Sequence, residues 1–154
     1  MSNARKDLFE NFAPQFINNN NRSVLVNHTT PIAKELFDIP DDNACCIFDA
    51  TYSFAQKSKN FAGQKQLWSE QKKMPLVKPM VGCTSDGYVL FVLGPFAAKH
   101  NDATILKECF KTNQHVMNTV SEGDIILVDK GFRDGIFKEK KLDVYCPGLG
   151  QLTL

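Results

Sequence analysis

The chain has 154 residues, of which 43% are hydrophobic and 23% are charged, and its net charge is +1. This length suits one domain, and the apolar share is enough for a buried core. The near-neutral balance excludes a strongly basic protein, so any surface that binds nucleic acid must be local.

The targeting signals predict a protein that stays inside the cell. No apolar run reaches the roughly 20 residues that span a bilayer, and residues 1–7 lack the apolar centre of a signal peptide. The five cysteines form no Cys-x-x-Cys pair and lie in apolar segments, which is typical of buried thiols in a reducing compartment. We therefore expect a nuclear or cytoplasmic protein that is not secreted and has no membrane partner.

Residues 1–43 predict a helical N-terminal extension. Apolar side chains recur at helical spacing over residues 5–17, and an asparagine-rich break follows. Residues 30–37 predict a second helix that Thr29 or Thr30 would cap. Four apolar residues of this helix are expected to form one face that packs against a sheet: Ile32, Ala33, Leu36 and Phe37.

Residues 44–49 predict the first strand of the remaining part of the chain, 44–154. The following segment is polar and without clean periodicity, and residues 56–80 hold six lysines against the single Glu70. Lysines neutralise phosphates and interleaved aromatic rings stack on bases, so this composition suits a nucleic-acid backbone. A solvated loop whose aromatic residues, Phe61 and Trp68, are anchored in the core explains the composition equally well.

Two β-rich runs, residues 76–84 and 88–94, flank Asp86-Gly87 and predict an antiparallel hairpin that Gly94-Pro95 closes. Pro79 indicates an edge, a bulge or a later start for the first of these strands.

Residues 101–111 predict a helix that Asn101 or Asp102 would cap. An apolar strand over 125–129 and a fifth strand over 142–146 follow. The order of elements predicts an α/β domain with a mixed sheet.

Asp49 and Asp129 each close an apolar run, and a crossover helix can bring two such strands side by side. A divalent cation relieves the repulsion between two neighbouring carboxylates, and Mg²⁺ favours oxygen ligands. Pairs of such ions clamp the attacking and leaving oxygens of phosphoryl transfer. The alternative is that each aspartate simply accepts hydrogen bonds at the end of a strand.

Several segments occur in an order that resembles DDE superfamily endonucleases, the transposases of the Harbinger and IS5-like type and their domesticated relatives. They are Ile47-Phe48-Asp49-Ala50-Thr51-Tyr52, Lys72 to Lys78, Val81 to Gly87, Asn101 to Leu106 and Gly123 to Phe132. The resemblance covers about residues 44–152 and implies an RNase H-like fold. It also implies a DNA endonuclease or transposase that hydrolyses phosphodiester bonds or transfers DNA strands. The alternative is an inactive domesticated module that binds DNA or a protein partner.

The resemblance assigns roles to individual residues. It implies that Asp49 and Asp129 are catalytic carboxylates that bind Mg²⁺ or Mn²⁺. Asp102 is expected to cap its helix or to support the metal ligands, with direct ligation the less favoured interpretation. DNA is the expected partner, together with a second copy of the chain or a DNA-binding protein. The residues expected to contact DNA are Lys72, Lys73, Lys78 and Trp68.

The family's third acid, usually a glutamate, lies on a helix beyond the fifth strand, whereas this sequence ends at Leu154. Asp134 and Glu139 are too near Asp129 to replace that acid. We therefore expect residues 44–154 to be a partial domain, truncated before the third acid, with weak or absent nuclease activity on its own.

Overall fold

The computed structural model describes residues 10, 21–57, 59–132, 143–146 and 150–152. Most of the helix expected over 5–17 lies outside these residues, as do Asp134 and Glu139. None of the described helices is long and apolar enough to cross a membrane.

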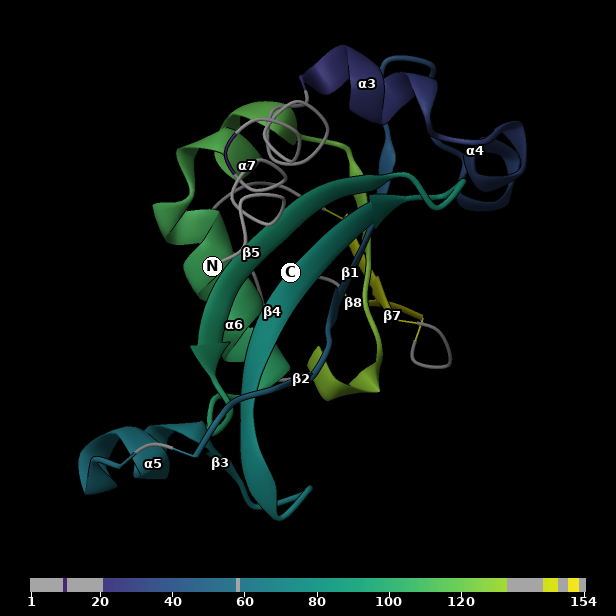
Figure 1. Cartoon of the computed structure of the whole chain (residues 1–154). Coiled ribbons are helices and arrows are strands. Elements are labelled where there is room, and N and C mark those ends of the chain that lie inside the picture. The colour runs from purple at the N-terminus through teal and green to yellow at the C-terminus, as the bar shows by residue number, and fades with distance from the viewer. Residues whose placement is uncertain (1–9, 11–20, 58, 133–142, 147–149, 153–154) are drawn as a thin grey trace.

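Short helices and a mixed sheet make up the described part of the chain (Figure 1). The helices are α3 (Arg22–Asn27), α4 (Pro31–Phe37), α5 (Phe61–Leu67), α6 (Asp102–Thr112), α7 (Gln114–Thr119) and the 3₁₀ helix η2 (Lys130–Phe132). The strands are β1 (Cys45–Ala50), β2 (Ser53–Phe54), β3 (Trp68–Ser69), β4 (Met74–Thr84), β5 (Val89–Ala97), β6 (Ile125–Leu127), β7 (Asp143–Cys146) and β8 (Gly150–Leu152).

β1 lies between an antiparallel neighbour, β4, and a parallel neighbour, β6. Val81 of β4 pairs with both Asp49 of β1 and Val92 of β5, so β1 and β5 lie on opposite edges of β4. β7 is parallel to β6, and β8 is antiparallel to β7. The strand order is therefore β5-β4-β1-β6-β7-β8, with β2 and β3 also paired to β4. This mixed sheet confirms the predicted α/β class.

The hairpin of β4 and β5 is longer than predicted. β4 runs through Pro79, and its register with β5 shifts between Lys78 and Met80, because a proline has no N–H to donate to the ladder. β5 continues past Gly94-Pro95 to Ala97, so the predicted strand end at that pair is wrong.

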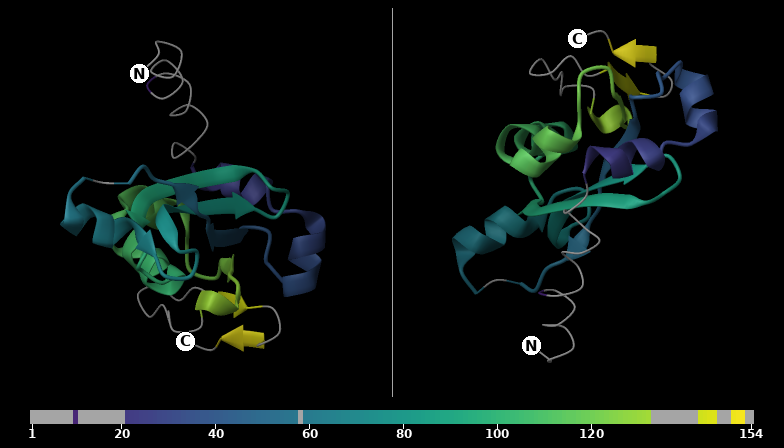
Figure 2. Two further views of the ribbon diagram at one scale, coloured as in Figure 1. Left: turned by 60° about the horizontal axis from the view of Figure 1, so that its bottom comes forward. Right: turned by 90° about the horizontal axis from the view of Figure 1, so that it is seen from above.

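The sheet is packed on both faces because side chains alternate along β1. Cys46 and Phe48 belong to the main core, which α3, α6 and α7 cover. Cys45 points to the other face and packs with Ala33 and Ile39 beneath α4. Figure 2 shows α3 and α4 at one end of the molecule and α5 at the other.

The apolar face predicted for α4 is only partly correct. Ala33 is buried and Phe37 is half-buried, but Ile32 and Leu36 are 77% and 72% exposed. Residues four apart lie above one another on a helix, so each pair forms its own stripe. α4 turns the stripe of Ala33 and Phe37 toward the sheet, and the other stripe faces away.

A helix that the sequence did not predict, α5, lies within the lysine-rich segment. Asn60 caps it by accepting a hydrogen bond from the Ala62 N–H at 2.9 Å. No residue of α5 is buried. The periodic apolar pattern from which a helix is recognised is therefore missing.

Candidate active site

The pairing of β1 with β6 places Asp49 and Asp129 side by side. Ile47 lies opposite Leu127 in this parallel pair, and each aspartate lies two residues beyond that point. Val128 is buried in the main core and Asp129 is exposed, so the alternation of the strand continues to Asp129. Both carboxylates therefore occupy the same face of neighbouring strands, which are spaced roughly 4.8 Å apart.

Asp129 is held by the turn that follows β6. The Gly131 N–H donates to Asp129 Oδ1 at 2.8 Å. A Cβ at Gly131 would lie 3.0 Å from that oxygen and 3.8 Å from Asp102 Oδ2. The carboxylates of Asp129 and Asp102 thus approach one point from two different elements, and a side chain at Gly131 would crowd Asp129 Oδ1.

Asp102 is the first residue of α6, but it is not the cap. Asn101 caps the helix by accepting from the Thr104 N–H at 2.7 Å. Asp102 Oδ1 instead accepts a hydrogen bond from Lys78 Nζ at 2.8 Å. Lys78 Nζ also donates to the carbonyl oxygen of His100 at 2.9 Å, so it fixes the start of α6 to β4.

Like charges surround Asp49. Partial burial raises the pKa of its carboxyl, and the nearby charges of Asp129 and then Asp102 raise it further. The Ala50 N–H donates to Asp49 Oδ1 at 2.9 Å and acts in the opposite direction, because it stabilises the ionised form. The structure therefore brings all three predicted acidic residues into one electrostatic neighbourhood.

The oxygen donors of this neighbourhood suit a hard divalent cation. Among the described residues, no group of three or more His, Cys, Asp or Glu side chains is arranged to hold a metal ion. Asp49 and Asp129 nevertheless offer two carboxylates, and Mg²⁺ is commonly held by one or two carboxylates while it keeps several waters. Asp102 is less suited to ligation because it is paired with Lys78.

Lys78 is buried, unlike the other two lysines expected to contact DNA. Side chains alternate between the two faces of β4, and Lys78 lies on the face that α6 covers, where it is only 5% exposed. The ammonium donates to both Asp102 and the His100 carbonyl, so this residue positions Asp102. The DNA contact of Lys78 stays a prediction that this burial does not favour.

The other residues expected to contact DNA lie near β3 and α5. Lys72 is exposed, and its Nζ lies 5.9 Å from the centre of the Tyr52 ring. Lys73 is exposed and forms an ion pair with Glu70 at 3.0 Å. Trp68 is half-buried on β3, opposite Pro75.

Phe61 distinguishes the two interpretations of the lysine-rich segment. It is 82% exposed, so the interpretation in which both aromatic residues are anchored in the core is wrong for Phe61.

Two residues of the site had no predicted role. Gly131 could have been noticed from the Asp-x-Gly spacing, because an aspartate often accepts a hydrogen bond from the backbone two residues later. Tyr52 lies 5.0 Å from Lys78 Nζ, measured to its ring centre, and donates from its hydroxyl to Gln71 Oε1 at 3.0 Å. No local pattern in the sequence indicates the contacts of Tyr52.

The family model described as DDE superfamily endonuclease matches residues 48–148, which include Asp49, Asp102 and Asp129. No curated protein and no solved structure matches the chain.

Proposed function

Because the chain belongs to the DDE superfamily endonucleases, we propose that it cleaves or transfers DNA strands at a metal site held by Asp49 and Asp129. The placement of these two carboxylates at the ends of β1 and β6 carries the proposal. The order β5-β4-β1-β6-β7, in which only β4 is antiparallel to β1, supports an RNase H-like fold. We further propose that the relatives are transposases of the Harbinger and IS5-like type.

Each residue of the site has a separate task in this proposal. Asp49 and Asp129 would hold Mg²⁺ or Mn²⁺, which when bound makes the phosphate more electrophilic and a water more acidic. The Gly131 N–H fixes the orientation of Asp129, and the Lys78 ammonium keeps Asp102 beside it. Like-charge repulsion on Asp49 supports this assignment, because a bound cation removes the repulsion.

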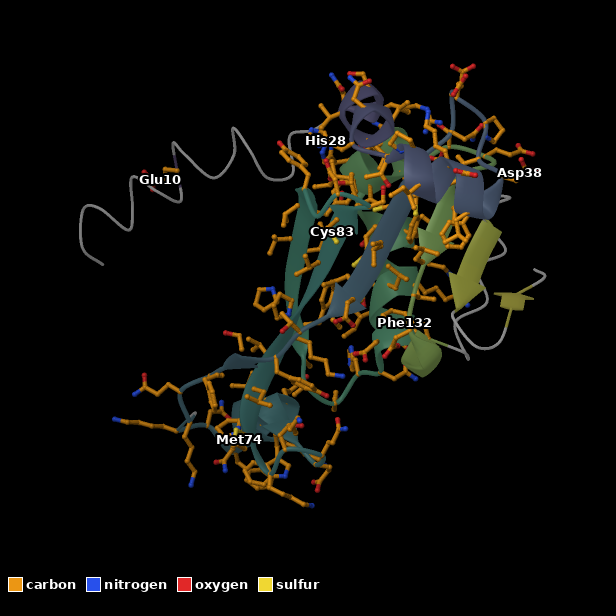
Figure 3. All side chains as sticks on the ribbon, turned by 90° about the vertical axis from the view of Figure 1, so that its right-hand side faces the viewer. Glu10, His28, Asp38, Met74, Cys83 and Phe132 are labelled. Carbon is orange, nitrogen blue, oxygen red and sulfur yellow. The ribbon has the colours of Figure 1, made fainter. Side chains whose placement is uncertain are left out.

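We propose that DNA approaches along the β3 and α5 end of the molecule. Lys72 and Lys73 are exposed there, and lysines neutralise backbone phosphates. Figure 3 places Met74, where β4 begins, at the far end of the molecule from His28 and Asp38, with side chains that end in nitrogen around it.

An inactive module that binds DNA or a protein partner is the second candidate. The ion pair between Asp102 and Lys78 favours it, because this pair withdraws the third nearby carboxylate from ligation. Such a module would keep the fold and the basic surface but would not cut DNA.

Calorimetric titration with Mn²⁺ tests the metal site. We expect the parent protein to bind Mn²⁺, and Asp49→Asn or Asp129→Asn to weaken that binding at least about tenfold, because each removes one charged ligand. Asp41→Asn, in an exposed turn near α4, is the matched control and should bind as the parent does.

Equal binding by every variant, or no binding by the parent, would contradict the site. A plasmid-nicking assay at the same Mn²⁺ concentration separates the two candidates. Metal binding without nicking would favour the inactive module.

A further inference from the structure

A groove of about 660 Å³ lies between α5, β3 and the loop that joins β5 to α6, and neither Asp49 nor Asp129 lines it. Its walls combine aromatic rings, cationic side chains and amides. The residues that matter here are Phe61, Gln64, Lys65, Trp68, Glu70 and Lys99.

Two aromatic side chains give the groove its apolar surface. Phe61 opens α5 and is largely exposed to water, and Trp68 directly follows the helix at its C-cap. The backbone beneath them is fixed, because Asn60 caps α5 and Trp68 pairs with Pro75 of β4. The rings therefore present a prepared surface that a flat ligand can cover.

The charge of the groove favours an anion. Lys65 and Lys99 line it, and the single acidic residue of the lining, Glu70, already pairs with Lys73. Aromatic surface beside lysines matches the two parts of a nucleotide, because bases stack on rings and lysines attract the phosphate. The amide of Gln64 can both donate to and accept from the edge of a base.

The same strand, β4, and one loop connect the groove to the carboxylate site. Trp68 pairs with Pro75, and Lys78, three residues further along β4, holds Asp102. Asp49 pairs with Val81, six residues beyond Pro75, and six residues of strand span roughly 20 Å. Lys99 lies three residues before Asp102, so one loop contributes to both places.

We infer that this groove binds an unpaired nucleotide of the DNA on which the carboxylate site acts, with its base stacked on Phe61 and Trp68. Lys65 and Lys99 hold the adjoining phosphate. The choice of DNA rests on the proposed function. Bases inside a duplex are covered by their neighbours, so the substrate class is DNA with an unpaired or frayed stretch several nucleotides from the reacting bond.

Trp68 allows a direct test because it is the only tryptophan of the chain. Its fluorescence is followed while a single-stranded oligothymidylate of 12 nucleotides is added in the presence of EDTA, so that no strand is cut. We expect saturable quenching, and about tenfold weaker binding by Phe61→Ala, which loses one base–aromatic stack. Lys65→Ala should weaken binding and reduce its salt dependence.

Phe54→Ala is the matched control, because Phe54 is an exposed phenylalanine on β2 outside the groove lining. It should bind the oligonucleotide as the parent does. A blunt duplex rich in G·C pairs should quench at least about tenfold less well than the single strand, because its bases are not available.

Three outcomes would overturn the inference. The first is equal binding of the oligonucleotide by the Phe61→Ala and Phe54→Ala variants, and the second is equal affinity for duplex and single strand. The third is a dimer of the parent protein, detected by light scattering, that dissociates in the Phe61→Ala variant but not in the Phe54→Ala variant. The last outcome would make the groove a contact between copies of the chain. Repeating the titration with Asp49→Asn separates the two proposals, because groove binding should persist in a protein that has lost its metal site.

Discussion

Asp49 carries a charge that its surroundings disfavour in the folded chain. Its pKa is raised by partial burial and by Asp129 and Asp102. A carboxyl with a raised folded-state pKa contributes most to stability below its unfolded pKa of about 3.9. That contribution is lost as the pH rises through the folded pKa. At neutral pH the ionised Asp49 therefore lowers the free energy of unfolding.

Asp49→Asn should stabilise the metal-free protein at pH 7 by about 0.5 kcal/mol, the scale of partly exposed charge interactions. The gain should vanish near pH 3, where Asp49 is already neutral. Urea denaturation in EDTA at both pH values measures the effect. Asp41→Asn, which is fully exposed, should give no such gain. A loss of stability on Asp49→Asn at pH 7 would contradict the repulsion described above.

The acidic residues of the site could be predicted from the sequence, but the residue that positions Asp102, Lys78, could not. Asp49 and Asp129 follow apolar strands, and that pattern is local. Lys78 looked like a surface cation because it lies in a lysine-rich segment. Its burial depends on the alternation of β4 and on where α6 begins, which are long-range facts.

At the scale of elements, one ion pair joins β4 to α6. Lys78→Met should remove the ammonium that satisfies both Asp102 and the His100 carbonyl. We expect a loss of about 2 kcal/mol in the free energy of unfolding, somewhat below a fully buried pair because Asp102 is partly exposed. Lys72→Met, also near Tyr52 but exposed, should change stability by less than about 0.5 kcal/mol.

A double variant sharpens this measurement. The double variant Lys78→Met/Asp102→Asn should lose less free energy of unfolding than the sum of the two single variants. Each single variant leaves one charge without its partner, whereas the double variant leaves none. Additive costs would contradict a direct interaction between the two side chains.

The larger elements were predictable because their patterns are strong. β1, the hairpin and α6 each carry a regular apolar period or a turn signal, and each is present in the structure. α5 was missed because it has no buried face, and β8 was missed because Gly150 to Leu152 offers only a short run. The predicted packing of Ile32 and Leu36 against the sheet was wrong for another reason. The sequence gives the stripes of α4 but not the direction from which the sheet meets them.

At the scale of the whole molecule, Asp124 joins α3 to the sheet. The residue is fully buried, and its carboxylate accepts hydrogen bonds from both Arg22 terminal nitrogens on α3, at 2.7 and 3.0 Å. It also accepts from the N–H groups of Ala44 and Ser121, at 3.0 and 2.8 Å. Leu25 of α3 is in the main core, so α3 packs as part of the same core as the sheet.

Asp124→Ala should therefore lower the free energy of unfolding by about 3 kcal/mol, because it removes the carboxylate partner of the Arg22 guanidinium and leaves two N–H groups without their acceptor. Guanidinium-chloride denaturation followed by circular dichroism measures this loss. Glu35→Ala, on the exposed side of α4, is the control and should cost less than about 0.5 kcal/mol. A loss confined to a separate early transition would indicate that α3 unfolds independently of the sheet.

The parallel pairing of β1 with β6 also determines when in folding the carboxylates meet. The hairpin of β4 and β5 closes a short loop and can form early, whereas β1 and β6 join segments about 80 residues apart. Every partly folded chain that has only the hairpin keeps Asp49 and Asp129 separate. The proposed metal site, and with it the proposed cleavage of DNA, therefore forms only after β1 has paired with β6.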